Sequence, residues 1–135
     1  MDTKSNTTPV AVKVLAGVLF LFGLVAFFGS LLLWGQGFIL RPPASMDLSY
    51  PVTDILVNAP ACLVAAVGLW HCRAYGYIAS QFVAGVFIYA SVEIFVQVAQ
   101  GSLAKDVAIL LPQVLAVAVA LLLVFYLWRI RAIFN

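Results

Sequence analysis

The chain has 135 residues, of which 65% are hydrophobic and only 9% are charged, and its formal net charge is +2. Because soluble domains carry about 25% charged residues, this composition is typical of an integral membrane protein. The small net charge also argues against nucleic acid or another anionic polymer as a partner.

Four apolar stretches are each long enough, or nearly so, to cross a bilayer as a helix. We predict these spans at Val14–Gly35, Asp54–Trp70, Tyr75–Val98 and Val107–Trp128. The spans and their connections use nearly the whole chain, which leaves no room for a soluble catalytic domain. The predicted fold is therefore an all-α, four-helix transmembrane bundle, a single domain over residues 14–128 with a polar tail at 1–13 and a short basic tail at 129–135.

The three connections between the predicted spans differ in character. The first, Gln36–Thr53, is long, contains three prolines and is rich in apolar residues. A free linker is more polar than this, so we expect a structured outer loop that either lies on the membrane surface or folds over the helix ends. The second, His71–Ala74, is a tight turn that makes an antiparallel hairpin of the second and third spans. The third, Ala99–Asp106, is short and contains Gly101.

The basic residues predict how the chain is oriented in the membrane. If the N-terminus is cytoplasmic, five of the seven basic residues lie inside, namely Lys4, Lys13, Arg73, Arg129 and Arg131. Only Arg41 and Lys105 then lie outside. We therefore expect both termini to be cytoplasmic. We also expect a bacterial inner (plasma) membrane location, because the chain is compact and shows no sorting signal.

Polar residues within the third span share one side of the predicted helix. Tyr89, Glu93, Gln97 and Gln100 follow one another at spacings of four, four and three, which at 3.6 residues per turn places them on one face. A carboxylate in hydrocarbon is costly, so an intramembrane glutamate is a functional candidate by default.

The second and fourth spans carry polar residues at a matching depth. Asp54 and Asn58 are four residues apart on the second span, and Gln113 lies on the fourth. Counted from the outer boundary, Asn58, Glu93 and Gln113 are all about 6–9 Å deep at 1.5 Å per residue. We expect their side chains to meet inside the bundle, because small residues on the same faces favour helix packing.

This convergence predicts an outward-facing polar pocket that binds or transports a cation or a small amphiphilic molecule. The aromatic ring of Tyr89 can contribute a cation–π contact, and Asp54 at the helix mouth would attract the same cation. Four helices enclose little volume, so transport would require a homo-oligomer. The candidate ligand-binding residues are Glu93, Asn58, Tyr89, Gln97, Gln113 and Asp54.

Two other interpretations stay open. The amides could be packing hydrogen bonds worth about 0.6 kcal/mol each, and Glu93 could pair with Arg41 or Lys105. Alternatively, the chain is an accessory or assembly subunit of a larger membrane complex, and its polar residues pair with a partner's helices. A single-chain pocket requires Glu93 to face Asn58 and Gln113, whereas a subunit interface allows it to face outward.

Enzymatic motifs are absent from the sequence. It contains no recognisable nucleophile–base arrangement, phosphate-binding glycine loop or cluster of metal ligands, and His71 alone is too little for a metal or haem site. We therefore favour a non-enzymatic protein, with no cofactor and no metal, over an integral-membrane enzyme whose catalytic groups would have to lie in the loops. The four helices in so short a chain resemble the architecture of the small multidrug exporters. Those proteins carry their glutamate in the first helix, so the likeness implies only that a chain of this size can transport as a dimer.

Overall fold

The computed structural model describes residues 9–37, 49–103 and 105–134, and within these residues all regular secondary structure is helical. Four helices are long and apolar enough to cross a membrane, at Val10–Gly35, Pro51–Trp70, Ala74–Ala99 and Val107–Arg129. The predicted all-α class with four helices of spanning length is thus confirmed. The expected outer loop lies largely outside the described residues, as does Arg41.

Two of the four spanning helices are interrupted by one π-helical turn each. The first spanning helix is the uninterrupted α1 (Val10–Gly35) and the third is α4 (Ala74–Ala99). The second runs from α2 (Ser49–Thr53) through a π-helical turn at Asp54–Asn58 into α3 (Ala59–Trp70). The fourth runs from α5 (Val107–Leu121) through a π-helical turn at Leu122–Tyr126 into α6 (Leu127–Arg129), and a short 3-10 turn at Arg131–Ile133 follows.

The first helix begins at Val10, four residues before the predicted start of the span at Val14. The predicted span began directly after Lys13, whereas α1 includes this residue. Lys13 is accommodated in the first turns of α1, because its side chain is exposed and its ammonium lies 5.8 Å from the centre of the Trp70 ring. Long basic side chains near a helix end can keep the charge at the surface while the stem covers apolar groups.

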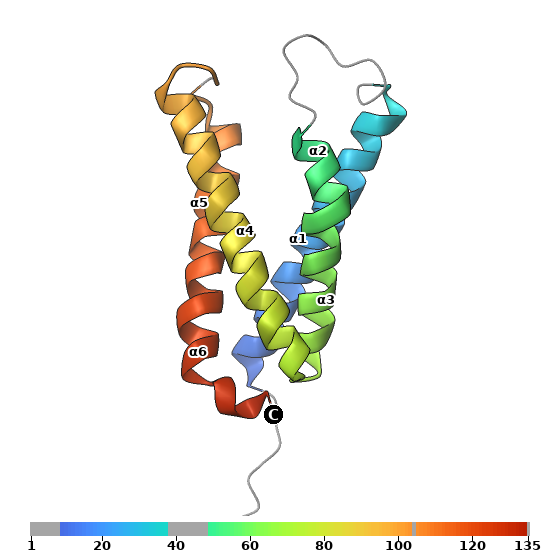
Figure 1. Ribbon diagram of the computed structural model, residues 1–135, viewed down its shortest axis with the longest axis vertical. Coiled ribbons are helices and arrows are strands. Elements are labelled where there is room, and N and C mark those ends of the chain that lie inside the picture. Colours follow the sequence, from blue (N-terminus) through green and yellow to red (C-terminus); the bar gives the residue numbers. More distant parts are fainter. Residues whose placement is uncertain (1–8, 38–48, 104, 135) are drawn as a thin grey trace, which may run out of the picture.

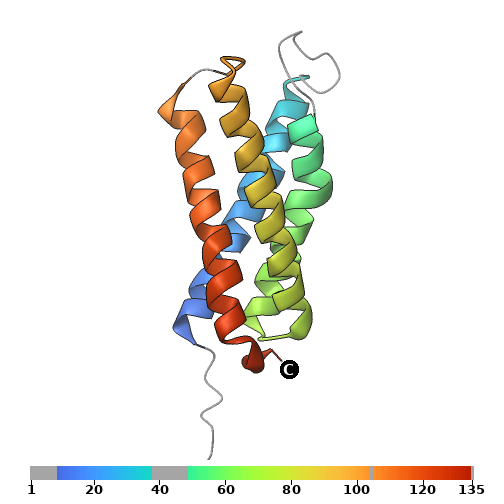
Figure 2. The same cartoon turned by 60° about the vertical axis from the view of Figure 1, so that its left-hand side comes forward.

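The helices pack in sequence, with α1 along α3, α3 along α4 and α4 along α5. We call the end that holds the α3–α4 turn the hairpin end, and the opposite end, which holds the α4–α5 connection, the loop end. The start of α1 and the C-terminal segment both lie at the hairpin end (Figures 1 and 2). The α1–α3 pair and the α4–α5 pair are close at the hairpin end and separate toward the loop end (Figure 1).

The α3–α4 hairpin is closed by a pair of glycines and a Schellman turn. The Arg73 N–H donates to the Gly68 carbonyl at 2.8 Å and the Cys72 N–H donates to the Leu69 carbonyl at 3.0 Å, the two bonds of that motif. Cys72 takes the left-handed position with φ +49°. A Cβ added at Gly68 would stand 2.6 Å from the backbone nitrogen of Gly76, so only glycine permits this approach.

The buried core occupies the hairpin half of the molecule. Its residues come from one stretch on each of the four spanning helices, plus one residue near the C-terminus: residues 12–19, 62–69, 83–87, 116–127 and Phe134. The Phe22 and Phe87 rings link α1 to α4 with their centroids 5.1 Å apart. The predicted polar residues nearer the loop end therefore lie outside the main core.

Candidate functional site

The face of α4 that packs into the bundle is lined by small residues at intervals of four. Gly76, Ser80 and Ala84 are all buried there, followed by Phe87 and Ser91. Spacings of three and four keep these residues on one side of the helix. Because small residues let membrane helices approach closely, this row fixes which side of α4 faces its neighbours.

Glu93 lies on a different side of α4 from this buried row. It follows Phe87 by six residues, which places it about 120° around the helix, and its side chain is only half-buried. Tyr89, one turn away on the same side, is 72% exposed. We call Tyr89, Glu93 and Gln97 the α4 polar face. The shared face predicted from the spacing is therefore present, but it is turned away from the packed side of the helix.

Within the described residues, no hydrogen bond or ion pair engages the Glu93 carboxylate. Asn58 and Gln113 make their hydrogen bonds to other groups. Lys105 is exposed in the α4–α5 connection and forms no ion pair in the described part of the chain. The side chains of Asn58, Glu93 and Gln113 were expected to meet inside the bundle. In the structure, Asn58 and Gln113 instead belong to two separate groups of hydrogen-bonded residues, and Glu93 belongs to neither.

The first group is a ladder on the second spanning helix. The Asn58 side-chain amide donates to the Asp54 carboxylate at 3.0 Å, and the Cys62 thiol donates to the side-chain oxygen Oδ1 of Asn58 at 3.5 Å. The ladder begins in the π-helical turn that ends just before Pro60. Proline cannot donate to the carbonyl four residues earlier and its ring crowds that carbonyl, and the wider turn relieves this conflict. Asp54 and Asn58 therefore satisfy each other within one helix.

The second group joins α4 to α5. The Ser91 hydroxyl lies 3.3 Å from both the Gln113 backbone carbonyl and its side-chain oxygen. Ser91 is fully buried, so this is a true interhelical contact. Sequence reasoning identified Gln113 but missed Ser91, because it selected large polar side chains. The row of small residues from Gly76 through Ser80 and Ala84 was the signal that could have found it.

A third polar contact, also missed from the sequence, involves Gln81 on α4. Its amide donates to the Leu123 carbonyl at 3.0 Å, and Leu123 belongs to the second π-helical turn. A π-helical turn disturbs the regular α-helical pairing of carbonyls, and a membrane offers no water to satisfy them. The Gln81 side chain supplies a donor at this point and links α4 to the fourth spanning helix.

Two cavities in the described part of the chain lie away from these polar groups. One is lined by α1 and α3 near Trp70 and His71, and another by α4 and the C-terminal segment near Tyr77 and Arg131. Neither is lined by a candidate ligand-binding residue. Among the described residues there is also no group of three or more side chains suited to hold a metal ion.

The length and composition of the four helices indicate a small helical membrane protein, and on the side of α4 it carries a carboxylate that has no partner among the residues the structure describes. Comparison with known proteins adds no closer assignment, because no family model, curated protein or solved structure matches the chain. Its function is therefore argued from its own residues.

Proposed function

We propose that this protein is a membrane subunit that binds another membrane-spanning chain through the α4 polar face. The observation that carries the proposal is the position of Glu93, half-buried on the side of α4 away from the packed row and without a partner among the described residues. A pocket within one chain would need Glu93 to face Asn58 and Gln113, and both of these are engaged elsewhere.

The chemistry of Glu93 indicates what the partner presents. An isolated carboxylate at this depth is costly in hydrocarbon, and such residues pair with one another or with donors. A partner helix with a lysine, an arginine or amide donors at the same depth would remove that cost. Tyr89 extends the same surface with an exposed ring that can pack on the partner or contact its cation.

A second copy of this chain in the same orientation is a poorer match. Four of the five basic residues that the structure describes lie at the hairpin end, namely Lys13, Arg73, Arg129 and Arg131. The fifth, Lys105, lies in the connection beyond the end of α4. Two facing copies of Glu93 would therefore bring like charges together, and none of the five described basic residues lies at their depth. A different chain that supplies the donor is the better fit.

The same charge distribution supports an orientation with both termini in the cytoplasm. Four basic residues gather at the hairpin end, whereas the described acidic residues, Asp54, Glu93 and Asp106, all lie toward the loop end. The positive-inside bias then favours a cytoplasmic location for the hairpin end. We propose a bacterial inner membrane as the location, with the α4 polar face in its outer half.

The test is native mass spectrometry of the protein extracted gently from its own membrane. Wild type is compared with Glu93→Gln, which removes the charge, and with Glu93→Leu, which also removes the hydrogen-bonding capacity. Asp106→Asn is the matched control, because it removes another carboxylate while asparagine still serves as an N-cap. We expect a bound protein mass in the wild type and the control, reduced in Glu93→Gln and lost in Glu93→Leu.

Three other results would overturn this proposal, each in its own way. A bound small molecule that disappears with the charge of Glu93 would instead support the alternative proposal, a site for a cation or small amphiphile. A dimer of this chain that dissociates in both Glu93 variants would show that the partner is a second copy. A partner protein retained equally by all four proteins would show that Glu93 plays no part in the association.

A further inference from the structure

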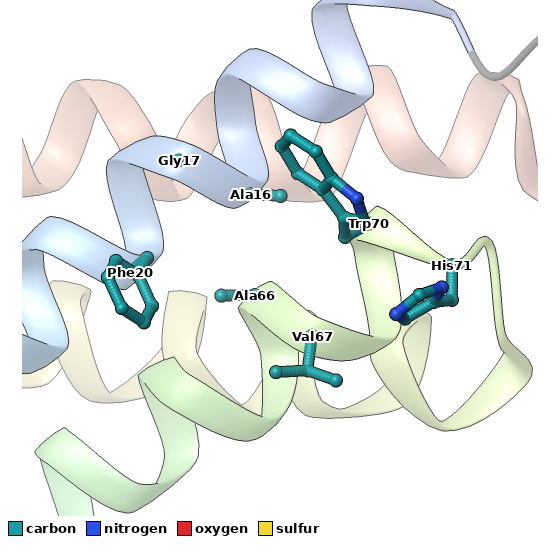
Figure 3. A pocket seen from close by; sticks show the side chains of 7 residues that line it. All are labelled: Ala16, Gly17, Phe20, Ala66, Val67, Trp70 and His71. Carbon is teal, nitrogen blue, oxygen red and sulfur yellow. The ribbon is translucent and has the colours of Figure 1, made fainter.

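The cavity between α1 and α3 is an apolar groove at the hairpin end. Its volume is about 270 Å³. Ala16 and Gly17 of α1 and Ala66 of α3 form its base, and the rings of Phe20 and Trp70 project on either side of it (Figure 3). Nothing in the described structure would meet a Cβ added at Gly17, so the space above this glycine is open.

Basic groups stand at one end of the groove. The Lys13 ammonium lies 5.8 Å from the centre of the Trp70 ring, which itself lines the groove. His71 lines the same end, at the last residues before the α3–α4 turn (Figure 3). Arg73 follows two residues later and is exposed. No acidic residue in the described part of the chain lies at the hairpin end, so the described ionisable groups near this end of the groove are basic.

We propose that this groove binds an anionic phospholipid, with an acyl chain lying over Gly17 between Phe20 and Trp70 and the phosphate group meeting Lys13 and His71. The groove is apolar along the membrane-embedded part of the helices and basic where the helices reach the membrane surface. An anionic phospholipid has its apolar acyl chains and its charged headgroup at the same two depths. Basic pockets between membrane helices are typical binding places for anionic headgroups.

Two features of the groove favour a lipid over a soluble anion. The lining is apolar except at the Trp70–His71 end, so most of the surface has no group for a phosphate to contact. The walls are also open toward the side of the bundle, where several large apolar side chains of α1 and α3 are exposed. The groove lies at the other end of the molecule from Glu93, and the proposal does not depend on the one made for the α4 polar face.

The test measures lipid binding by native mass spectrometry in detergent micelles, titrated with dioleoylphosphatidylglycerol or with dioleoylphosphatidylcholine. Gly17→Leu fills the groove, and Gly29→Leu is its control on the same helix, because Gly29 also has open space and does not line the groove. Lys13→Gln removes the ammonium, and Arg131→Gln is its control, because Arg131 lies at the same end on the ring of Trp128 at 4.4 Å.

We expect wild type to retain phosphatidylglycerol more strongly than phosphatidylcholine. Gly17→Leu should abolish the tightly bound lipid, and Lys13→Gln should weaken the preference for the anionic lipid about fivefold, while both controls bind as wild type does. Circular dichroism of each variant confirms that it is folded. Equal retention of the two lipids by wild type, or wild-type binding by a folded Gly17→Leu, would overturn the proposal. Equal losses in Lys13→Gln and Arg131→Gln would overturn it as well, since they would reflect charge alone.

Discussion

The tight contact between Gly68 and Gly76 makes a specific prediction about the stability of the bundle. In Gly68→Ala, the new methyl group would stand 2.6 Å from the Gly76 nitrogen and 2.7 Å from an edge carbon of the Tyr75 ring. The Gly76 nitrogen is backbone and cannot turn aside as a flexible side chain can. In this variant, α3 and α4 must therefore move apart next to the turn that joins them. The main core lies in the same half of the molecule, so its packing is disturbed as well.

The size of the effect follows from two opposing contributions. Forcing an extra methyl group into a packed interface costs about 1–3 kcal/mol, whereas replacing glycine by alanine within a helix returns up to about 1 kcal/mol. We expect Gly68→Ala to lower the free energy of unfolding by about 1–2 kcal/mol. Gly85→Ala is the matched control on α4, because nothing lies near an added Cβ there, and it should be neutral or slightly stabilising.

The assay is reversible unfolding in mixed micelles, with sodium dodecyl sulfate as denaturant and helicity by circular dichroism as the signal. The midpoint should fall for Gly68→Ala and stay level or rise for Gly85→Ala. If the two variants unfold alike, the close approach of the two helices is not a feature of the protein in micelles, and the argument from the glycine pair fails.

Three further variants probe the turns and the interhelical contacts, all by the same unfolding measurement. Cys72→Gly should stabilise by up to about 1 kcal/mol, because the left-handed conformation at Cys72 is costly for a residue with a Cβ; a lower midpoint would contradict this. Asp106→Ala should cost about 1 kcal/mol by removing the cap that accepts from the Ala108 N–H at 3.0 Å, and Asp106→Asn should not; equal midpoints would refute the cap. Ser91→Ala should cost about 0.6 kcal/mol, the usual worth of a hydrogen bond between membrane helices, and a cost several times larger would mean that more than the Gln113 contact is lost.

The sequence was sufficient to predict the four apolar helices of spanning length and the tight turn between α3 and α4. Both depend on local properties, namely the length of each apolar run and the shortness of the connection. The shared face of Tyr89, Glu93 and Gln97 was also predictable, because it depends only on spacing along one helix.

The direction in which that face points was not predictable in the same way. Rotation of a helix about its own axis is set by its closest contacts, which for α4 are the small residues Gly76, Ser80 and Ala84. Glu93 therefore does not meet Asn58 and Gln113, although the three residues lie at about the same depth along their helices. The π-helical turn before Pro60 adds a further difficulty, because periodicity counted at 3.6 residues per turn does not hold across it.

The π-helical turns at Asp54–Asn58 and Leu122–Tyr126 also affect how the chain tolerates changes in length. Each turn holds about one residue more than an α-helical turn would, so removing one residue there would leave a regular helix in place of the wide turn. A single-residue deletion within either turn should therefore be far less disruptive than one within Ala59–Trp70, where it would rotate one part of the helix by about 100° relative to the other. In related chains, one-residue gaps are expected at these two places before anywhere else in the four spanning helices.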